Sequence, residues 1–284
     1  MSKHLFINVT VLDCSGDEPF RGEVLVEGNE IVAVAREGES LHRDGAEIID
    51  GGDGTTLMPG LVESHAHLSI DNTDDLAALG RIPPEEHTLL TMHNARLYLD
   101  HGITSCISAA SAKPRLDVVI RNAIEKGEIP GPRLLAATPW LTVTSGLGDM
   151  RTLHMPKVDS MALMADGPEE YRRLTRELIR EGVDIIKLVI SGDSFVPHAG
   201  SQTTIMSEEE VAAAAEVARG VDPYLRETRS IMDSLRRRTP GISKELPAVR
   251  DLWGQPIEFR SGLGWAYDAV SPIYSRREKA SPID

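Results

Sequence analysis

The sequence has few cysteines, few aromatic residues and no long apolar run. Of its 284 residues only Cys14 and Cys106 are cysteines, which excludes a disulfide framework and favours a reducing compartment. The first residues lack the apolar core of a signal peptide, and no run approaches the roughly 18 apolar residues that span a bilayer. We therefore expect a soluble, cytoplasmic protein without a membrane partner.

Basic residues are in deficit as well. Lys and Arg total 30 against 44 Asp and Glu, so the formal net charge is −14. A nucleic-acid or anionic-membrane partner needs a basic footprint, and this balance argues against both. The hydrophobic share of 41% in a chain of this length suffices for a globular protein with a substantial core.

Two patterns of secondary structure precede residue 220. Residues 1 to 57 contain short β-rich runs separated by turn residues, and Gly28-Asn29 between two alternating runs predicts a hairpin. From residue 58 to 219, strand-like and helix-like segments alternate, which is typical of βα units around a parallel sheet. We expect strands at 103–108, 133–137 and 183–190, and helices at 87–101, 116–126, 168–181 and 208–218. Gly102, Gly127 and Gly182 should end the first three helices, and Ser207-Glu208-Glu209-Glu210 predicts a capping box at the start of the fourth.

The most informative segment runs from Met58 to Leu68. A short apolar run ends at Pro59-Gly60, and a second one leads to His65 and His67. On a strand, residues i and i+2 point to the same face, so both imidazoles can bind one metal ion from one side. Imidazole suits Zn, Fe and Ni. The alternative is a pair of surface histidines in a turn.

The run Pro59-Gly60-Leu61-Val62-Glu63-Ser64-His65-Ala66-His67 resembles the Pro-Gly-hydrophobic-hydrophobic-Asp-x-His-x-His signature of the amidohydrolase superfamily. Glu63 stands where many members have Asp. The resemblance extends from the first residues to about residue 219, and the most similar subgroup is the imidazolonepropionase-like and Xaa-Pro dipeptidase-like hydrolases. It implies a TIM-type (β/α) barrel preceded by a small β-sandwich portion. It also implies a divalent metal, Zn in the first place, bound by His65 and His67, and hydrolysis of a C–N bond.

Lys187 lies within a run of Ile, Leu and Val, where an unpaired ammonium is costly. One interpretation is a strand-end lysine that reaches solvent along its stem. However, residues 185–192 resemble the fourth barrel strand of amidohydrolases, in which a lysine is carboxylated and bridges two metals. The resemblance therefore implies a carbamylated Lys187 as a third metal ligand, a form that a low dielectric and nearby cations favour.

The remaining residues do not complete the family's site. The family supplies two further histidines from strands 5 and 6 and an Asp from strand 8, whereas all nine histidines here lie at or before His198. His154 and His198 follow the third and fourth strands, on the side where barrel sites form, but neither matches a ligand position of the family. We expect the others to be ordinary solvent-exposed histidines: His4, His42, His87, His93 and His101.

The chain changes character near Gly220. Residues 220–284 do not resemble the family, and they predict one helix at 223–238 followed by a segment rich in Pro and Gly. A (β/α)₈ barrel takes about 250 residues, and only about 160 lie between the first barrel strand and this change. We therefore expect an α/β fold in which an incomplete TIM-type (β/α) barrel of about four βα units, 58–219, follows a β-sandwich portion, 1–57.

Two functions are compatible with these observations. The first is a metal-dependent amidohydrolase acting on a small-molecule amide or dipeptide, impaired by the loss of the second half of the barrel. The second is a non-catalytic, truncated or fused remnant that binds metal or associates with itself, since exposed sheet edges invite pairing with another copy. The sequence assigns no catalytic acid or base.

Overall fold

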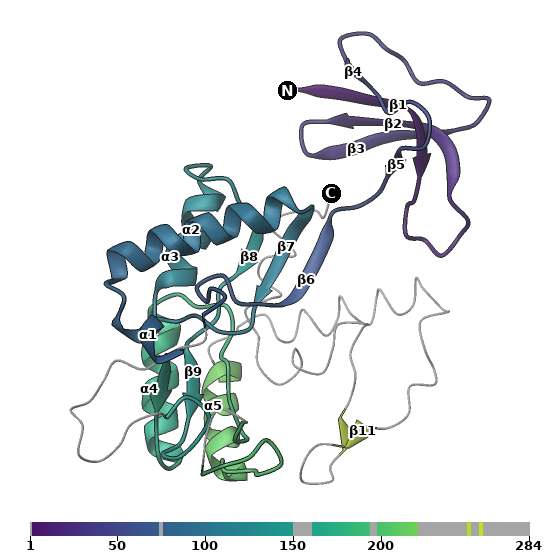
Figure 1. Cartoon of the computed structure of the whole chain (residues 1–284). Helices are drawn as coiled ribbons and strands as arrows, with labels where there is room; N and C mark the ends of the chain where they lie inside the picture. Colours follow the sequence, from purple (N-terminus) through teal and green to yellow (C-terminus); the bar gives the residue numbers. More distant parts are fainter. Residues whose placement is uncertain are drawn as a thin grey trace. The chain divides into compact units, whose positions relative to one another are not determined.

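The computed structural model describes residues 2–73, 76–149, 161–193 and 198–220, and the backbone of 249–250 and 256–257. The part of the chain before residue 221 divides into two compact units, with the boundary between Leu61 and Val62 (Figure 1).

The first unit is a five-stranded sheet. Its strands are β1 (Lys3–Val11), β2 (Phe20–Glu27), β3 (Glu30–Arg36), β4 (Glu47–Asp50) and β5 (Thr56–Leu57). The order is β3-β2-β1-β4, with β5 also paired to β1. Pairing is antiparallel for β1–β2 and β2–β3 and parallel for β1–β4 and β1–β5. The sequence suggested a β-sandwich portion here, whereas the described residues form one sheet.

The hairpin predicted at Gly28-Asn29 is confirmed. Glu27 and Glu30 are the last pair of the β2–β3 ladder, and Gly28 has a φ of 66°. A positive φ costs glycine little because it has no Cβ, which explains why this residue suits the turn.

The second unit alternates strands and helices. Its elements are β6 (Leu61–Ala66), α1 (Leu76–Arg81), α2 (Pro84–Asp100), β7 (Ile103–Ser108), α3 (Leu116–Glu125), β8 (Arg133–Leu135), β9 (Trp140–Thr142), β10 (Ala162–Met164), α4 (Pro168–Arg180) and α5 (Glu208–Gly220). Strands β6, β7 and β8 form one sheet in that order, β7 and β8 are parallel, and β9 pairs with β10. These βα units match the predicted alternation, and within the described residues they form no closed barrel.

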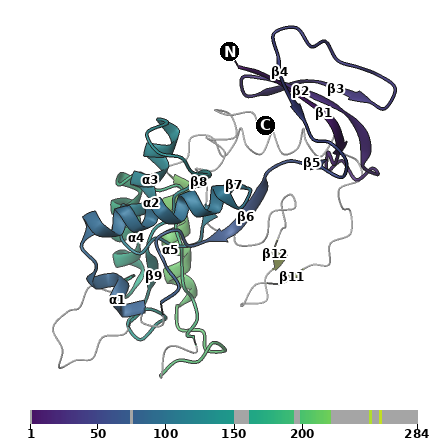
Figure 2. The ribbon, with the colours of Figure 1, turned by 45° about the horizontal axis from the view of Figure 1, so that its top comes forward.

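Helices α2 and α3 lie together beside the β6-β7-β8 sheet, as Figure 2 shows. Buried side chains fill the space between them: Ala66, Leu68, Ala95, Cys106, Ile120 and Leu134. A second core joins α4 and α5 to the segment that follows β8, and it includes Ala136, Leu141, Tyr171, Leu178, Val183 and Ala214.

The predicted C-terminal ends of α2, α3 and α4 are confirmed within one residue, whereas α2 begins at Pro84, three residues before the predicted start. Gly102, Gly127 and Gly182 each follow a helix and each has a φ between 72° and 90°, the left-handed conformation that closes helices. The capping box at the start of α5 is also present. The Ser207 hydroxyl accepts from the Glu210 N–H at 3.3 Å, and a Glu210 carboxylate oxygen accepts from the Ser207 N–H at 2.8 Å.

The strand predicted at 183–190 is not regular. The structure has only two isolated parallel bridges there, between Ala137 and Ile185 and between Leu141 and Leu188. The ladder is interrupted because the Lys187 N–H donates to the Thr138 side-chain hydroxyl, 2.9 Å away, in place of a main-chain carbonyl. The prediction of a continuous strand was therefore wrong, although the segment does lie alongside the residues that follow β8.

Some elements of the structure were not predicted, and one predicted helix cannot be compared with it. The sequence did not indicate α1, β9 or β10. In the tail, β11 (Val249–Arg250) pairs antiparallel with β12 (Pro256–Ile257), and the helix predicted at 223–238 lies outside the described residues. Among the helices that the structure describes, none combines the length and the apolar character required to cross a membrane.

Candidate metal site

His65 and His67 lie at the end of β6, close to each other. Between them Ala66 is fully buried in the core formed with α2 and α3, so strand alternation turns the flanking histidines away from that core. The centroids of the two imidazole rings are 5.2 Å apart, with an angle of 73° between the ring planes. The centroid of the Trp140 ring is 6.5 Å from that of His67, and the two rings form a T-shaped pair.

A backbone contact defines the tautomer of His67. Its Nδ1 lies 3.3 Å from the carbonyl oxygen of Ala110, in the loop after β7. A carbonyl can only accept, so Nδ1 carries the proton in the neutral ring and Nε2 keeps its lone pair. This is the arrangement in which an imidazole is oriented by one nitrogen and binds a metal through the other.

Both imidazoles are neutral at neutral pH. Burial lowers the pKa of His67 to about 4; the Ala110 contact opposes this shift, and the charges of His65 and Lys187 add to it. Burial and then the charge of Lys187 also lower the pKa of His65, against the opposing charge of Glu63. Neutral imidazole is the form that binds metals, so neither ring has to release a proton.

Lys187 is the third residue that the sequence predicts for the site. Its charge contributes to the lowered pKa of both imidazoles. Burial lowers the pKa of Lys187 and so raises the fraction of neutral amine, the form that reacts with CO₂. The interpretation of a lysine extending freely into solvent is thereby disfavoured.

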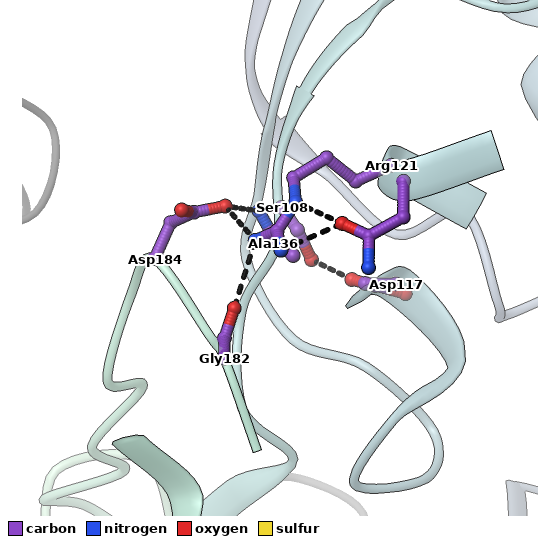
Figure 3. Close-up of polar contacts among 7 residues, drawn as sticks. Ser108, Asp117, Arg121, Ala136, Gly182 and Asp184 are labelled. Carbon is purple, nitrogen blue, oxygen red and sulfur yellow. Dashed lines mark hydrogen bonds and ion pairs between the residues drawn. The ribbon is translucent and has the colours of Figure 1, made fainter. Parts of the chain in front are cut away.

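The backbone around Lys187 is held on both sides. Its N–H donates to the Thr138 hydroxyl at 2.9 Å, and its carbonyl accepts from the Leu141 N–H at 3.0 Å. Three residues earlier, the buried carboxylate of Asp184 pairs with Arg121 of α3 at 2.6 Å and accepts from the Ala136 N–H at 2.8 Å. Figure 3 shows Arg121 reaching from α3 toward Asp184 and the Gly182 carbonyl.

The turn that follows the histidines is held by α2. The Asn94 amide donates to the Leu68 carbonyl at 2.8 Å, and Nε2 of His87 lies 2.7 Å from the Ser69 carbonyl oxygen. The Ser69 hydroxyl in turn accepts from the Ala112 N–H at 2.7 Å. These contacts restrain the backbone directly after His67.

The sequence-based expectation for His87 was wrong. We expected a solvent-exposed histidine, whereas the residue is completely buried. The signal was present in its spacing, because His87, Thr91 and Ala95 recur every four residues and form the buried stripe of α2. A histidine on that stripe has to find a hydrogen-bond partner, and the Ser69 carbonyl provides it.

The other two histidines considered for the site have different outcomes. Nε2 of His198 lies 3.1 Å from the carbonyl oxygen of Ser145, so this side chain contacts the loop at 144–149. His154 lies outside the described residues. Within the described part of the chain, no group of three or more His, Cys, Asp or Glu side chains is placed to hold a metal ion.

Comparison with known proteins identifies the family. The sequence profile of the amidohydrolase family matches residues 56–224, more than half of the chain. The chain belongs to the amidohydrolase family. Members of this family are generally metal-dependent.

Individual relatives agree with this assignment. Ochratoxinase from Aspergillus niger is 26% identical over 269 residues, covering 83% of this chain and 53% of the relative. A crystal structure of an amidohydrolase matches with a TM-score of 0.68 and 29% identity, covering 77% of this chain and 54% of that one. A prolidase in complex with N-methylphosphonate-L-proline matches with a TM-score of 0.67 and 26% identity, over the same shares of both chains. The chain thus spans about half the length of the relatives it matches.

Proposed function

We propose that this amidohydrolase binds a divalent metal ion through His65, His67 and a carbamylated Lys187. Zn²⁺ is the first candidate for this ion. We further propose that it hydrolyses a C–N bond in a small amide or dipeptide. The observation that carries the proposal is the pair of neutral imidazoles with ring centroids 5.2 Å apart at the end of β6, within the electrostatic reach of Lys187.

The chemistry of these side chains fits one such ion. Zn²⁺ in catalytic sites takes three protein ligands from nitrogen, sulfur and oxygen donors and leaves one position open. Two neutral imidazoles and one carbamate oxygen make up such a set. When bound, the metal would polarise the scissile carbonyl and lower the pKa of a water molecule. His67 would keep its orientation through the Ala110 carbonyl, and Trp140 would cover one side of its ring.

The relatives support a small amide or peptide as substrate. Amidohydrolase homologues act on small amides, and one structural relative is a prolidase with a proline derivative bound. We therefore propose N-acyl amino acids and Xaa-Pro dipeptides as the first compounds to test.

Turnover by this chain alone should be slow. The chain has no histidine after His198, and no carboxylate is assigned to move the proton from water. Absence of a general base typically costs about 10²–10⁴-fold in rate. The same observation supports a second candidate function, a metal-binding protein without catalysis.

Metal content tests the proposal most directly. After exposure to Zn²⁺ and bicarbonate and then dialysis, elemental analysis should find about one ion per chain. His65→Ala and His67→Ala should each lose it. The matched control is His101→Ala, since the His101 ring bonds only to the Leu97 carbonyl of its own helix at 2.7 Å in the described contacts. Full retention of metal by His67→Ala would refute the assigned ligands.

Activity distinguishes the two candidates. The metal-loaded chain is assayed on N-acyl amino acids and Xaa-Pro dipeptides. Slow turnover that disappears in His65→Ala supports the hydrolase. Stoichiometric metal without any turnover supports the non-catalytic metal-binding protein.

A further inference from the structure

Asp117 is a fully buried carboxylate in the first turn of α3. One of its oxygens accepts a hydrogen bond from the Ser108 hydroxyl, a contact drawn in Figure 3. The other oxygen, Oδ1, is buried and has no hydrogen-bond partner. The Ser111 hydroxyl, which donates to the Lys113 carbonyl at 2.7 Å, and the Ala137 N–H favour the ionised form of the carboxyl. All three of these neighbouring groups are neutral, in contrast to the guanidinium that pairs with the buried Asp184. A buried charge held only by neutral donors is costly, and its presence therefore needs a reason.

These groups come from two successive strand ends. Ser108 is the last residue of β7, Ser111 lies three residues further on, and Ala137 follows β8. A single carboxylate thus lies next to the two backbone segments that leave the sheet beside the histidine pair, and it is bonded to the first of them.

The first segment leads to His67. Between Ser108 and Ser111, the Ala109 N–H donates to the Ala66 carbonyl at 2.7 Å, and the Ala110 carbonyl oxygen lies 3.3 Å from Nδ1 of His67. The first residue of this four-residue loop, Ser108, is bonded to Asp117. The position of the Ala110 carbonyl, and with it the tautomer of His67, therefore depends on the carboxylate.

The second segment leads to Lys187. The Ser111 N–H donates to the Thr138 carbonyl at 3.0 Å, and the Thr138 hydroxyl accepts from the Lys187 N–H at 2.9 Å. Thr138 also donates its N–H to the Ile185 carbonyl at 2.9 Å. Because the loop that Ser108 joins to Asp117 also holds Thr138 through Ser111, the carboxylate supports the residue to which the Lys187 backbone is bonded.

We propose that Asp117 is a positioning residue that orients His67 through the Ala110 carbonyl and supports the backbone of Lys187 through Thr138. This inference rests on the proposed function, in which these two residues bind metal. Burial raises the pKa of Asp117 to about 6, while Ser108, Ser111 and Ala137 oppose the shift, so the carboxylate is mostly ionised at neutral pH.

The first test uses the metal-free protein. With ¹⁵N-labelled histidine, long-range ¹H–¹⁵N spectra report which ring nitrogen of His67 is protonated. The wild-type chain should show a predominant Nδ1–H form. Asp117→Asn keeps the size of the side chain but replaces one acceptor oxygen by an NH₂ group, so it should produce a mixture of tautomers. A simple loss of stability would not change the tautomer of a folded protein.

The second test measures Co²⁺ affinity by the absorption of the bound ion. Loss of a residue that orients a metal ligand typically costs about 10–100-fold in affinity, and we expect about 10-fold for Asp117→Asn. The matched control is Glu210→Gln. Glu210 is another buried carboxylate, which accepts from the N–H groups of Gly167 and Ser207 and lies on α5. Its replacement should leave both the His67 tautomer and the Co²⁺ affinity unchanged.

The outcomes separate this inference from the proposed function. A wild-type chain that binds no Co²⁺ refutes the metal site, and the tautomer of His67 still decides whether Asp117 positions it. A folded Asp117→Asn chain with wild-type tautomer and affinity overturns the inference. If that variant does not fold, Ser108→Ala removes the hydroxyl that bonds to Asp117, and an unchanged tautomer in that variant overturns the inference equally.

Discussion

The two segments that carry the proposed ligands are built in opposite ways. Strand β6 is regular, yet its first residues are open to solvent, with 49% of Leu61 and 60% of Val62 exposed. Residues 183–190 form only isolated bridges, yet Val183, Ile186 and Val189 are buried. The histidines are therefore placed by the alternation of a strand, whereas the lysine is placed by packing and by contacts with distant residues.

The difference lies in where the backbone partners come from. At the lysine segment a side-chain hydroxyl, that of Thr138, replaces a carbonyl in the ladder, and a buried ion pair anchors the start of the segment to α3. At the histidine segment, the Ala66 carbonyl accepts from the Ala109 N–H and the His67 ring contacts the Ala110 carbonyl, both in the loop after β7.

The largest effect should follow from breaking the Arg121–Asp184 ion pair. Arg121→Met leaves the buried Asp184 carboxylate without its cation, which should lower the free energy of unfolding by about 3–5 kcal/mol. Urea denaturation measures this change. The matched control is Arg173→Met, which breaks the exposed pair with Glu177 and should cost less than about 1 kcal/mol. Equal losses in the two variants would mean that the lysine segment is not anchored by this pair.

A smaller effect should come from one apolar residue in each segment. Val183 is 2% exposed, and Val183→Ala should lower the free energy of unfolding by about 2 kcal/mol, through lost burial and the cavity that remains. Val62→Ala makes the same chemical change at a position that is 60% exposed, and it should cost less than about 0.5 kcal/mol. Thermal or urea denaturation of both variants tests the contrast directly. The prediction is contradicted if Val62→Ala lowers the free energy of unfolding more than Val183→Ala does.

The smallest effect concerns the carbamate. Bicarbonate should raise the Zn²⁺ affinity of the wild-type chain by about 10-fold, equal to about 1.4 kcal/mol, because carbamylation of Lys187 adds a charged oxygen ligand. Lys187→Gln should bind Zn²⁺ with the same affinity with and without bicarbonate. Calorimetric titration with and without bicarbonate measures both. A bicarbonate effect that persists in Lys187→Gln would show that the anion acts elsewhere.

Much of the fold could be predicted because its signals are local. The Gly28-Asn29 turn, the glycines that follow α2, α3 and α4, and the Ser207–Glu210 capping box each involve residues within a few positions of one another. Backbone preferences and capping bonds act over that range, so a short stretch of sequence contains all the partners. The pairing of His65 with His67 belongs to the same class, since strand alternation needs only two positions.

The residues that the predictions missed have distant partners. His87 was assigned to solvent although it is buried against Ser69, 18 positions away. The sequence around Asp117 did not predict its role, because no nearby residue indicates that Ser108 and the backbone after β8 lie next to its carboxylate. The regular strand expected at 183–190 failed for the same reason, since its interruption is caused by Thr138, 49 positions earlier.

The sequence by itself determined the order of most strands and helices, the C-terminal ends of α2, α3 and α4, and the histidine pair, because these depend on spacing along the chain. Only the tertiary structure decided what surrounds that pair. The Ala110 carbonyl lies 43 positions from His67, and the Arg121–Asp184 pair spans 63 positions. Such contacts form where strands pair and helices pack, and the energy of a buried charge or hydrogen bond depends on the low-dielectric surroundings that this packing creates.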